Sequence, residues 1–307
     1  MADHILIIGA GGFVGNRLVQ ALTARGQAVL ALCRHTPGSI GAEAEIHVSP
    51  GDDPSDYRPL LRRSRAVVHV ASASTPGSSA ARPMLELDEN LRPTLALLQA
   101  LQEFPAKPLL YVSSGGTLYD PKAKDADELA RVAPRSYHGA GKIAAEHFVS
   151  AWCTQFGGAA TIFRPSNLYG PGQTQRAGFG IVPTAFGKLL RGETLQVWGD
   201  GSARRDYLYV DDFVRLCLAA LDAAPIAGAH VFNACSGTSV SLDDLFAMIE
   251  RVTGRQLPRS YDATRPVDMP RVEMQADRAR AMFGWIAQVG MEEGLARTWK
   301  WFSTTQR

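Results

Sequence analysis

The feature that most constrains the fold is a run of glycines between a short apolar stretch and a helical pattern near the amino terminus. Residues 5–8 are apolar and rich in isoleucine, and the motif G-A-G-G-F-V-G follows at residues 9–15. Apolar residues then recur at every fourth position, which places them on one face of a helix over residues 14–24. A strand, a glycine turn and a helix in this order are typical of a βαβ unit, so the sequence predicts a parallel sheet.

Short apolar runs rich in β-branched residues alternate with longer stretches of helical period through the first half of the chain. This alternation predicts an α/β fold with a Rossmann-type doubly wound parallel sheet. The expected strands cover residues 5–8, 28–32, 46–48, 66–70, 109–113 and 161–163. The expected helices of this half cover residues 14–24, 57–63, 84–103 and 139–156.

The pattern changes near residue 166, where loops rich in glycine and proline connect shorter helices. Loops of this kind often form the specificity side of a site. We therefore expect one domain over residues 1–165, joined by residues 204–235, and a smaller C-terminal α/β domain, mainly substrate-binding, over residues 166–307. The expected helices here cover residues 184–190, 213–221, 242–253 and 295–302.

The composition argues against several classes of protein. The 307 residues include 32 Lys and Arg against 30 Asp and Glu, a net charge of +2, which argues against nucleic-acid binding. The four cysteines are scattered and the histidines show no ligand spacing, so we expect neither a disulfide framework nor a metal site. No apolar run reaches the roughly 18–20 residues that span a bilayer. We expect a cytoplasmic protein with no membrane partner.

The glycine motif between strand and helix predicts a dinucleotide site. Glycines let the backbone approach a pyrophosphate, the helix N-terminus offers free N–H groups, and the last glycine permits close packing of helix on strand. The alternative is a glycine-rich turn without a ligand. The candidate residues are Gly9, Gly12, Phe13, Val14 and Gly15.

The end of the second strand bears on which dinucleotide binds. An acidic residue there would favour NAD, but the chain has Cys33-Arg34-His35. The Arg34 guanidinium can pair with a 2′-phosphate, which favours NADP(H), or it can be a solvated loop residue. After the third strand, Asp52 or Asp53 could accept a hydrogen bond from the adenine amino group, unless the two only form a turn.

Six ordered motifs extend over nearly the whole chain and carry a resemblance to a known family. They occupy residues 9–15, 67–71, 111–119, 138–142, 164–172 and 205–211. Together they resemble the extended short-chain dehydrogenases/reductases, and among these the NAD-dependent epimerase/dehydratase family, which acts on nucleotide sugars and includes UDP-glucose 4-epimerase. The resemblance implies an NAD(P) cofactor, with NAD favoured by the family, and it assigns Ala71 and Lys142 to cofactor binding.

The resemblance also implies hydride transfer between a sugar carbon and nicotinamide, while a tyrosine takes the hydroxyl proton and a lysine lowers the pKa of that tyrosine. The family places the tyrosine four residues before the lysine, a position that His138 occupies here, with Tyr137 one residue earlier. Helix residues four apart lie about 40° apart around the axis, and residues five apart about 140°. Three alternatives stay open: Tyr137 turned inward, His138 as the base, or a site that has lost its chemistry.

A serine or threonine of the family also bonds the reacting oxygen, and that position falls on Gly115 in this chain. Ser114 and Thr117 are the nearest substitutes, and we favour Ser114. The alternative is that both hydroxyls only satisfy backbone groups of the turn.

On the substrate side, Asn167, Arg205 and Arg265 match family positions that hold a nucleoside diphosphate, and Asn90 resembles a residue near the nicotinamide. Either arginine could instead pair with a neighbouring carboxylate, and Asn90 could lie on a helix surface. The resemblance thus implies a UDP- or dTDP-hexose as substrate. It also implies a homodimer that pairs through the helices over residues 84–103 and 139–156.

Three functions are compatible with these motifs. The first is epimerisation at C4 of a nucleotide sugar, with a cofactor that stays bound. The second is reduction of a keto-sugar nucleotide by exchangeable NADPH, and the third is a non-catalytic NADP(H)-binding sensor.

Overall fold

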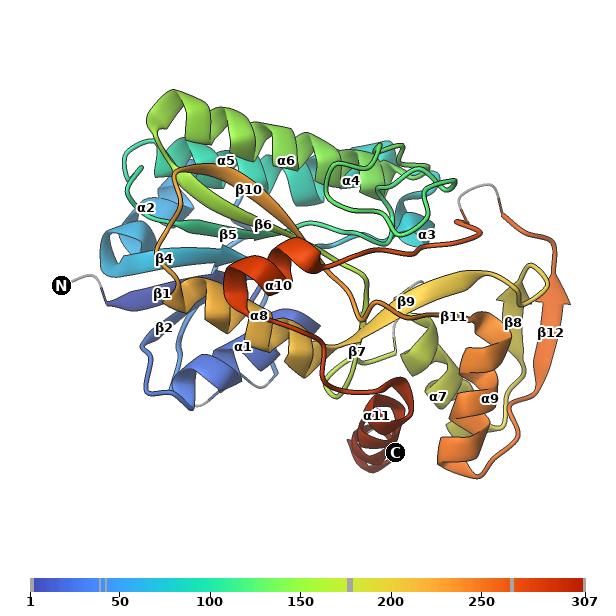
Figure 1. Ribbon diagram of the computed structural model, residues 1–307. Helices are drawn as coiled ribbons and strands as arrows, with labels where there is room; N and C mark the ends of the chain where they lie inside the picture. The colour runs from blue at the N-terminus through green and yellow to red at the C-terminus, as the bar shows by residue number, and fades with distance from the viewer. Residues whose placement is uncertain (1–2, 39, 42, 176–178, 266–267, 306–307) are drawn as a thin grey trace.

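A computed structural model describes residues 3–38, 40–41, 43–175, 179–265 and 268–305 as two unequal units (Figure 1). The larger unit is built on one sheet of seven parallel strands, so the predicted Rossmann-type fold is confirmed. In spatial order the strands are β10 (Gly228–Ala234), β6 (Ala159–Pro165), β5 (Leu109–Val112), β4 (Ser64–His69), β1 (His4–Ile8), β2 (Val29–Cys33) and β3 (Glu45–Val48). The order reverses at β1, so the loops that leave β1 and β4 diverge and open a crevice.

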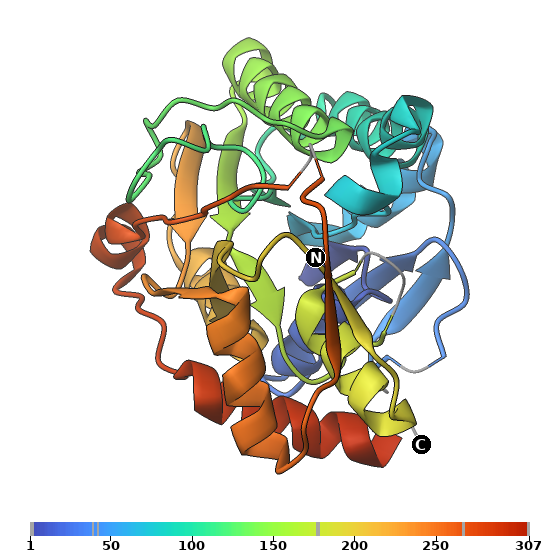
Figure 2. The same cartoon turned by 90° about the vertical axis from the view of Figure 1, so that its right-hand side faces the viewer.

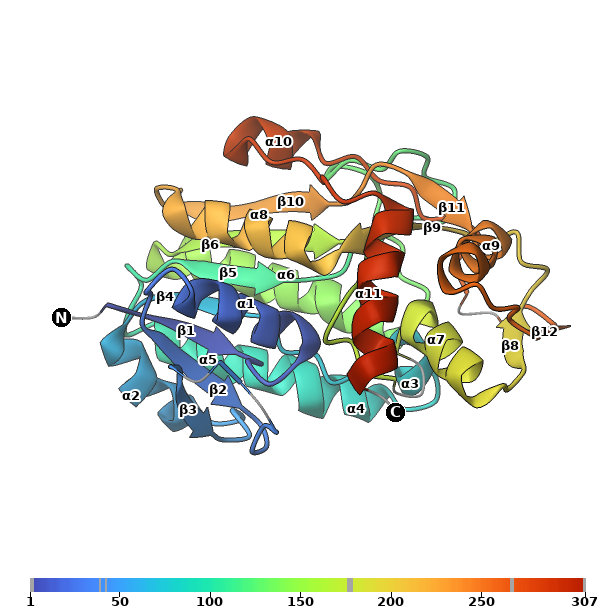
Figure 3. The same cartoon turned by 90° about the horizontal axis from the view of Figure 1, so that it is seen from below.

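Helices cover both faces of this sheet. One face carries α1 (Phe13–Thr23), α8 (Val210–Asp222) and α10 (Asp277–Phe283), and α1 and α8 lie side by side there (Figure 3). The other face carries α2 (Pro54–Arg63), α5 (Arg92–Leu101) and α6 (Tyr137–Phe156). Each face of the sheet has its own apolar core, because strands buried on both sides are apolar at nearly every position.

The helix expected over residues 84–103 is present as one continuous helical path over residues 83–101, which three segments make up. These are α4 (Pro83–Glu86), the π-helical turn η1 (Leu87–Leu91) and α5. Pro93 has no N–H to donate and stands at the start of α5, where the wider turn absorbs the missing bond. A further short helix, α3 (Pro76–Ser79), lies in the loop after β4 and was not expected.

Within the described residues, the smaller unit has two small sheets and three helices. Figure 2 looks onto this unit. One sheet contains β7 (Asn167–Tyr169), β9 (Arg204–Tyr209) and β11 (Ser239–Ser241), and the other contains β8 (Leu195–Trp198) and β12 (Arg259–Asp262). The helices α7 (Ile181–Arg191), α9 (Leu242–Thr253) and α11 (Met291–Thr305) pack on a third apolar core. The chain thus passes into this unit at β7, returns to the large sheet for β10, and leaves it again.

No helix in the part of the chain that the structure describes is long and apolar enough to cross a membrane.

Candidate active site

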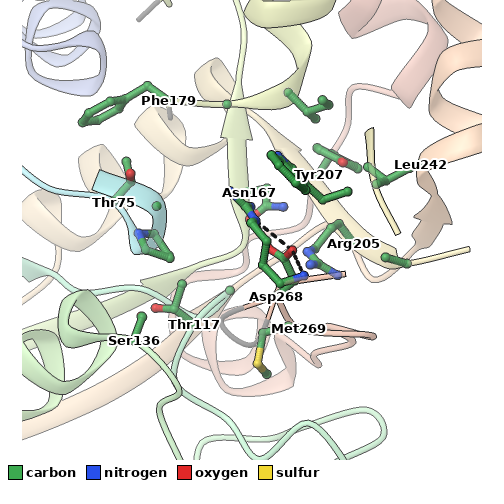
Figure 4. Close-up of a pocket in the computed structure, with 18 of the residues that line it drawn as sticks. Thr75, Thr117, Ser136, Asn167, Phe179, Arg205, Tyr207, Leu242, Asp268 and Met269 are labelled. Atoms are coloured by element: carbon green, nitrogen blue, oxygen red, sulfur yellow. Dashed lines mark hydrogen bonds and ion pairs between the residues drawn. The ribbon is translucent and has the colours of Figure 1, made fainter. Parts of the chain in front are cut away.

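A cavity of about 910 Å³ lies between the two units, beyond the carboxyl ends of the large sheet's strands. The larger unit lines it with the loops after β4 and β5 and with the start of α6. The smaller unit lines it from β7, β8, β9 and the loop before residue 270. Figure 4 shows Thr75, Thr117 and Ser136 on one side, and Arg205 and Tyr207 on the other. A ligand here would contact both units.

The glycine loop brings two strands and a helix closer together than any side chain would allow. A Cβ at Gly9 would lie 2.6 Å from Cα of Ala71, and one at Gly15 would lie 2.1 Å from the carbonyl oxygen of Gly9. Gly9 also has a φ of +88°, which favours glycine. The structure therefore gives Gly15 the packing role that the sequence predicts, and it packs Ala71 against the loop.

The N-terminus of α1 fits the pyrophosphate of a dinucleotide. Its N-cap, Gly12, provides no side-chain hydrogen bond, and the first turn contains no acidic residue. The N–H groups of the first turn, from Phe13 and Val14 onward, have no carbonyl of the helix to bond and are available to an anion. Phe13 additionally lies beside the loop from the smaller unit, since a Cβ at Gly172 would be 3.7 Å from its ring.

Two residues expected at the adenosine end have partners within the chain. Arg34 forms an ion pair with the Glu89 carboxylate and donates a 2.8 Å hydrogen bond to the Glu89 carbonyl, so its guanidinium is engaged. Asp53 is the N-cap of α2 and accepts a 2.8 Å hydrogen bond from the N–H of Ser55. The cap engages one oxygen of Asp53, and an adenine contact stays a prediction for both Asp52 and Asp53.

His138 and Lys142 share the buried face of α6, as their spacing predicts. His138 is 7% exposed and lines the cavity, and its Nδ1 lies 2.9 Å from Oγ of Ser74. Burial, and secondarily the charge of Lys142, lower the pKa of His138 to about 3, so its imidazole is neutral.

Lys142 is almost fully buried one helical turn further along α6. Its Nζ donates a 3.0 Å hydrogen bond to the carbonyl of Val112 and lies 5.4 Å from the centre of the Tyr111 ring. Burial lowers its pKa to about 8, while the carboxylates of Glu86 and Glu146 act in the opposite direction. The ammonium therefore sits close to its titration range.

Tyr137 is not turned inward, which overturns that alternative for the base. It is the first residue of α6 and is 45% exposed, and it is absent from the cavity wall among the described residues. The cause is the helical angle: because Ser136 caps the helix just before it, Tyr137 already follows the helical path that separates it from Lys142.

The two candidate hydroxyls after β5 both line the cavity. Thr117 donates a 3.0 Å hydrogen bond to Oγ of Ser114, so they form one polar pair. The intervening Gly115 has no room for a side chain, because a Cβ there would lie 2.8 Å from the backbone carbonyl oxygen of Arg164 as well as against the side chain of Met274. The hydroxyl that the family places at this position is thus excluded by packing.

Asn90 is not among the described residues that line the cavity, and its assignment to substrate binding stays a prediction. Its amide forms two hydrogen bonds with the loop after β4. Nδ2 donates a 2.9 Å hydrogen bond to Oγ of Ser74, and Oδ1 accepts a 2.8 Å hydrogen bond from the N–H of Ala73. The π-helical turn η1 carries Asn90 and aims it at this loop.

Sequence reasoning missed Ser74 and Glu86. Ser74 lines the cavity and bonds the Glu86 carboxylate, which is itself 4% exposed. A position just beyond the carboxyl end of a strand is a signal that could have found Ser74. Glu86 gave no such signal, because its segment reads as an ordinary helix surface.

Three predicted substrate residues gather at the other end of the cavity. Arg205, Asn167 and Arg265 all line it, and Figure 4 shows Asn167, Arg205 and Asp268 converging there. Arg265 makes two hydrogen bonds to Asp268, of 2.7 and 3.0 Å, and its guanidinium lies 5.1 Å from the centre of the Trp198 ring.

Arg205 is less fully paired than Arg265. It donates a 2.8 Å hydrogen bond to the carbonyl of Arg204, and burial lowers its pKa. Gly116 makes room for its neighbour Asn167, since a Cβ there would lie 2.8 Å from Oδ1 of Asn167. This end combines fixed donors with positive charge, which suits a phosphate oxygen.

The chain is similar to proteins of one family along its whole length. Residues 5–235 match the NAD dependent epimerase/dehydratase family. A UDP-glucose 4-epimerase of Mycolicibacterium smegmatis is 30% identical over 97% of both chains, and a dTDP-4-dehydro-6-deoxy-D-allose reductase of Streptomyces is 29% identical over 99% of this chain and 97% of that protein.

Among solved structures, the UDP-glucose 4-epimerase of Thermotoga maritima with UDP-glucose superposes with a TM-score of 0.93. The two are 27% identical over 99% of this chain and 100% of that one. The fold and the site define a dinucleotide-dependent enzyme of the short-chain dehydrogenase/reductase type. The chain belongs to the NAD dependent epimerase/dehydratase family, as its motifs indicate.

Proposed function

We propose that this protein is an NAD-dependent enzyme that epimerises C4 of a UDP- or dTDP-linked hexose. The observation that carries the proposal is one cavity that the buried His138 lines at one end, with Lys142 a helical turn further along α6, and that Arg205 and Asn167 line at the other end. A nucleoside diphosphate bound by the arginine end would leave the hexose near the histidine. Binding energy from the remote diphosphate then orients the reacting carbon.

In the proposed reaction NAD, when bound, would supply the nicotinamide to which the sugar carbon loses a hydride and from which it regains one. His138 holds the substrate hydroxyl and takes its proton, because it is the neutral imidazole that lines the cavity. The Ser114 and Thr117 hydroxyls lie ready to bond the same oxygen. Lys142 adds positive charge beside the reacting groups, which stabilises a developing alkoxide.

The engaged Arg34 supports NAD over NADP. A 2′-phosphate would have to compete with, and lie close to, the carboxylate of Glu89. Like charges at that distance disfavour binding, so the preference for NADP(H) that a free arginine suggests is weakened.

The alternative is a reductase that uses exchangeable cofactor on a keto-sugar nucleotide, which the similarity to the Streptomyces reductase favours. The deciding experiment begins with the nucleotide released when the purified protein is denatured. UDP-glucose, UDP-galactose and their dTDP counterparts are then incubated with the protein and separated by chromatography. Interconversion with retained NAD supports the epimerase, whereas oxidation of added NADH or NADPH by a 4-keto sugar nucleotide supports the reductase. A protein that is inactive in both assays would support the third alternative, a non-catalytic dinucleotide-binding sensor.

We also propose a homodimer, formed through the outer faces of α5 and α6, which lie together on one face of the sheet (Figure 1). Phe148 of α6 is 46% exposed, and Met84 before α5 is 60% exposed. A second copy of the chain would cover both. Sedimentation should give a dimer for the native protein and a monomer for Phe148→Glu. A cytoplasmic location is part of the same proposal, since all four cysteines are free and buried.

A further inference from the structure

A lysine affects a histidine base and a tyrosine base in opposite ways. A nearby ammonium stabilises a phenolate, but it disfavours an imidazolium, because histidine gains a positive charge when it takes up a proton. Lys142 accordingly contributes to the lowered pKa of His138. A histidine at this position therefore needs another group that can take up the charge or the proton.

A chain of hydrogen bonds behind the imidazole supplies such a group. Oγ of Ser74 lies 2.9 Å from Nδ1 of His138 and also bonds Oε2 of Glu86. Asn90 fixes this serine by donating a 2.9 Å hydrogen bond to the same Oγ. The direct separation between His138 Nδ1 and Glu86 Oε2 is 3.9 Å, so the serine hydroxyl links the two groups.

The Glu86 carboxyl is suited to take up a proton. It is 4% exposed, and its Oε1 has no hydrogen-bond partner within the described part of the chain. Burial raises the pKa of Glu86, while the hydrogen bond from Ser74, the charge of Lys142 and the neighbouring Asn90 amide act in the opposite direction. A buried carboxylate with one unsatisfied oxygen gains from becoming neutral.

Helix α6 has room for Glu86 because residue 141 is glycine. A Cβ at Gly141 would lie 2.5 Å from both Cγ and Oε1 of Glu86. Glycine inside a helix costs about 1 kcal/mol relative to alanine, so a glycine one residue before Lys142 indicates a packing requirement. The carboxyl is thus built into the site against α6.

We propose that Glu86 acts through Ser74 and His138 as the final acceptor of the substrate proton, an inference that rests on the proposed function. The network assigns the imidazole tautomer. When Glu86 is ionised it accepts the single hydroxyl proton of Ser74, so Nδ1 of His138 must donate to Oγ. Nε2 of His138 is then unprotonated. No other described residue bonds this nitrogen, and the side chain that carries it lines the cavity.

The transfer balances without forming an imidazolium. The substrate O–H bond breaks as an N–H bond forms at Nε2, the Nδ1 proton moves to Oγ of Ser74, and the former serine proton moves to Oε2 of Glu86. The electron pair of the C–H bond goes to the NAD that the proposed function supplies. The histidine and glutamate together lose one negative charge, as a phenolate does when protonated. His138 touches the substrate, and Ser74 and Glu86 are positioning residues.

The first test needs neither substrate nor turnover. Nitrogen-15 NMR of histidine-labelled protein follows the His138 tautomer from the most acidic pH at which the protein stays folded up to the pKa of about 8 of Lys142, whose charge acts on both His138 and Glu86. We expect Nε2–H at the acidic end and Nδ1–H at the other, and no such change in Glu86→Gln. An unchanging tautomer in the native protein, or an imidazolium instead, would overturn the proposal.

The second test uses kinetics with matched variants. Glu86→Gln should lower kcat by about tenfold or more with little change in KM, and Ser74→Ala should do the same, whereas Ser74→Thr keeps the hydroxyl and retains activity. Asp88→Asn, an exposed neighbour paired with Arg92, is the control that should match the native enzyme.

The most discriminating result is that Glu86→Gln lowers kcat in the native enzyme but does not lower it when residue 138 is a tyrosine. In a His138→Tyr background the phenolate carries its own negative charge, so an ionised Glu86 opposes it. Adding Glu86→Gln there should leave kcat unchanged or raise it, and an equal loss in both backgrounds would mean a merely structural glutamate. If the native protein turns over no nucleotide sugar, the proposed function fails while the NMR result still decides the relay.

Discussion

The two ends of the cavity are built in different ways. At one end, which we call the proton end, His138, Lys142 and Glu86 are each at most 7% exposed; Ser74 links His138 to Glu86, and the charge of Lys142 acts on both. At the other, the arginine end, the Arg265 side chain is 42% exposed and is paired with Asp268. Buried charges interact strongly, so the groups of the proton end depend on one another, whereas the partly solvated pairs of the arginine end are screened. Substitutions should therefore abolish function at the proton end and weaken it by degrees at the arginine end.

The largest effect that tests this contrast is expected for Lys142→Met. The substitution removes the only positive charge that bears on both His138 and Glu86 among the described groups. We expect kcat to fall by about 100-fold or more while the circular dichroism spectrum stays native, since general acid–base groups contribute on this scale.

The chain offers a matched control for this prediction. Lys107 also donates to a backbone carbonyl, that of Ser64, and lies 5.7 Å from the centre of the Phe104 ring, but its charge acts on neither His138 nor Glu86. Lys107→Met should lower stability without reducing kcat. Equal kcat values for Lys142→Met and Lys107→Met would show that the proton end does not depend on the charge of Lys142.

Arg205→Ala should have the next largest effect. Loss of a hydrogen bond to a charged group weakens binding by about 1.5–3 kcal/mol, or about 10- to 150-fold in the Kd of UDP or dTDP measured by calorimetry. Arg204→Ala is the control, because Arg204 is directed to Ser239 instead. No binding of either nucleotide to the native protein would contradict the role of the arginine end altogether.

A smaller effect is expected for Glu89→Gln, which frees Arg34 from its ion pair. An exposed pair of this kind is worth little, so NADPH affinity should rise by about fivefold while NADH affinity stays the same. Fluorescence titration with both cofactors measures the ratio. Stronger binding of NADPH than NADH by the native protein would mean that Arg34 leaves Glu89 when the cofactor binds.

The smallest effect is expected for Asp53→Ala. The loss of an exposed helix cap should lower the melting temperature slightly and leave cofactor affinity unchanged. A fall in cofactor affinity in this variant, measured by the same titration, would support the predicted adenine contact of Asp53.

The parts of the site that depend on the backbone could be predicted from the sequence. The glycine loop could be predicted because its contacts follow from the order of the elements. Gly9, Ala71 and Gly15 meet wherever β1 pairs with β4 and α1 packs on them. The shared face of His138 and Lys142 followed from helical spacing alone. Where α6 begins was not settled by the sequence, and the structure, in which Ser136 is the cap, decides that Tyr137 points away.

Other roles depended on which partner stands nearby, and the sequence leaves that open. From the sequence, Arg34 appears as a free cation. In the structure, the turn η1 places Glu89, which is 55 residues later in the chain, against it. The sequence suggests that Asn90 lies near the nicotinamide, and the structure shows that the same turn directs its amide toward Ser74.

By itself, the sequence determined the Rossmann-type sheet, the dinucleotide loop and the departure from the family's tyrosine, because each is set by local periodicity or by residue identity. Only the tertiary structure decided how that departure is compensated. Glu86 and Gly141 are far apart in the chain and meet where α4 contacts α6. The pKa values of His138 and Lys142 arise there from burial and neighbouring charge, which are properties of the assembled interior rather than of any one segment.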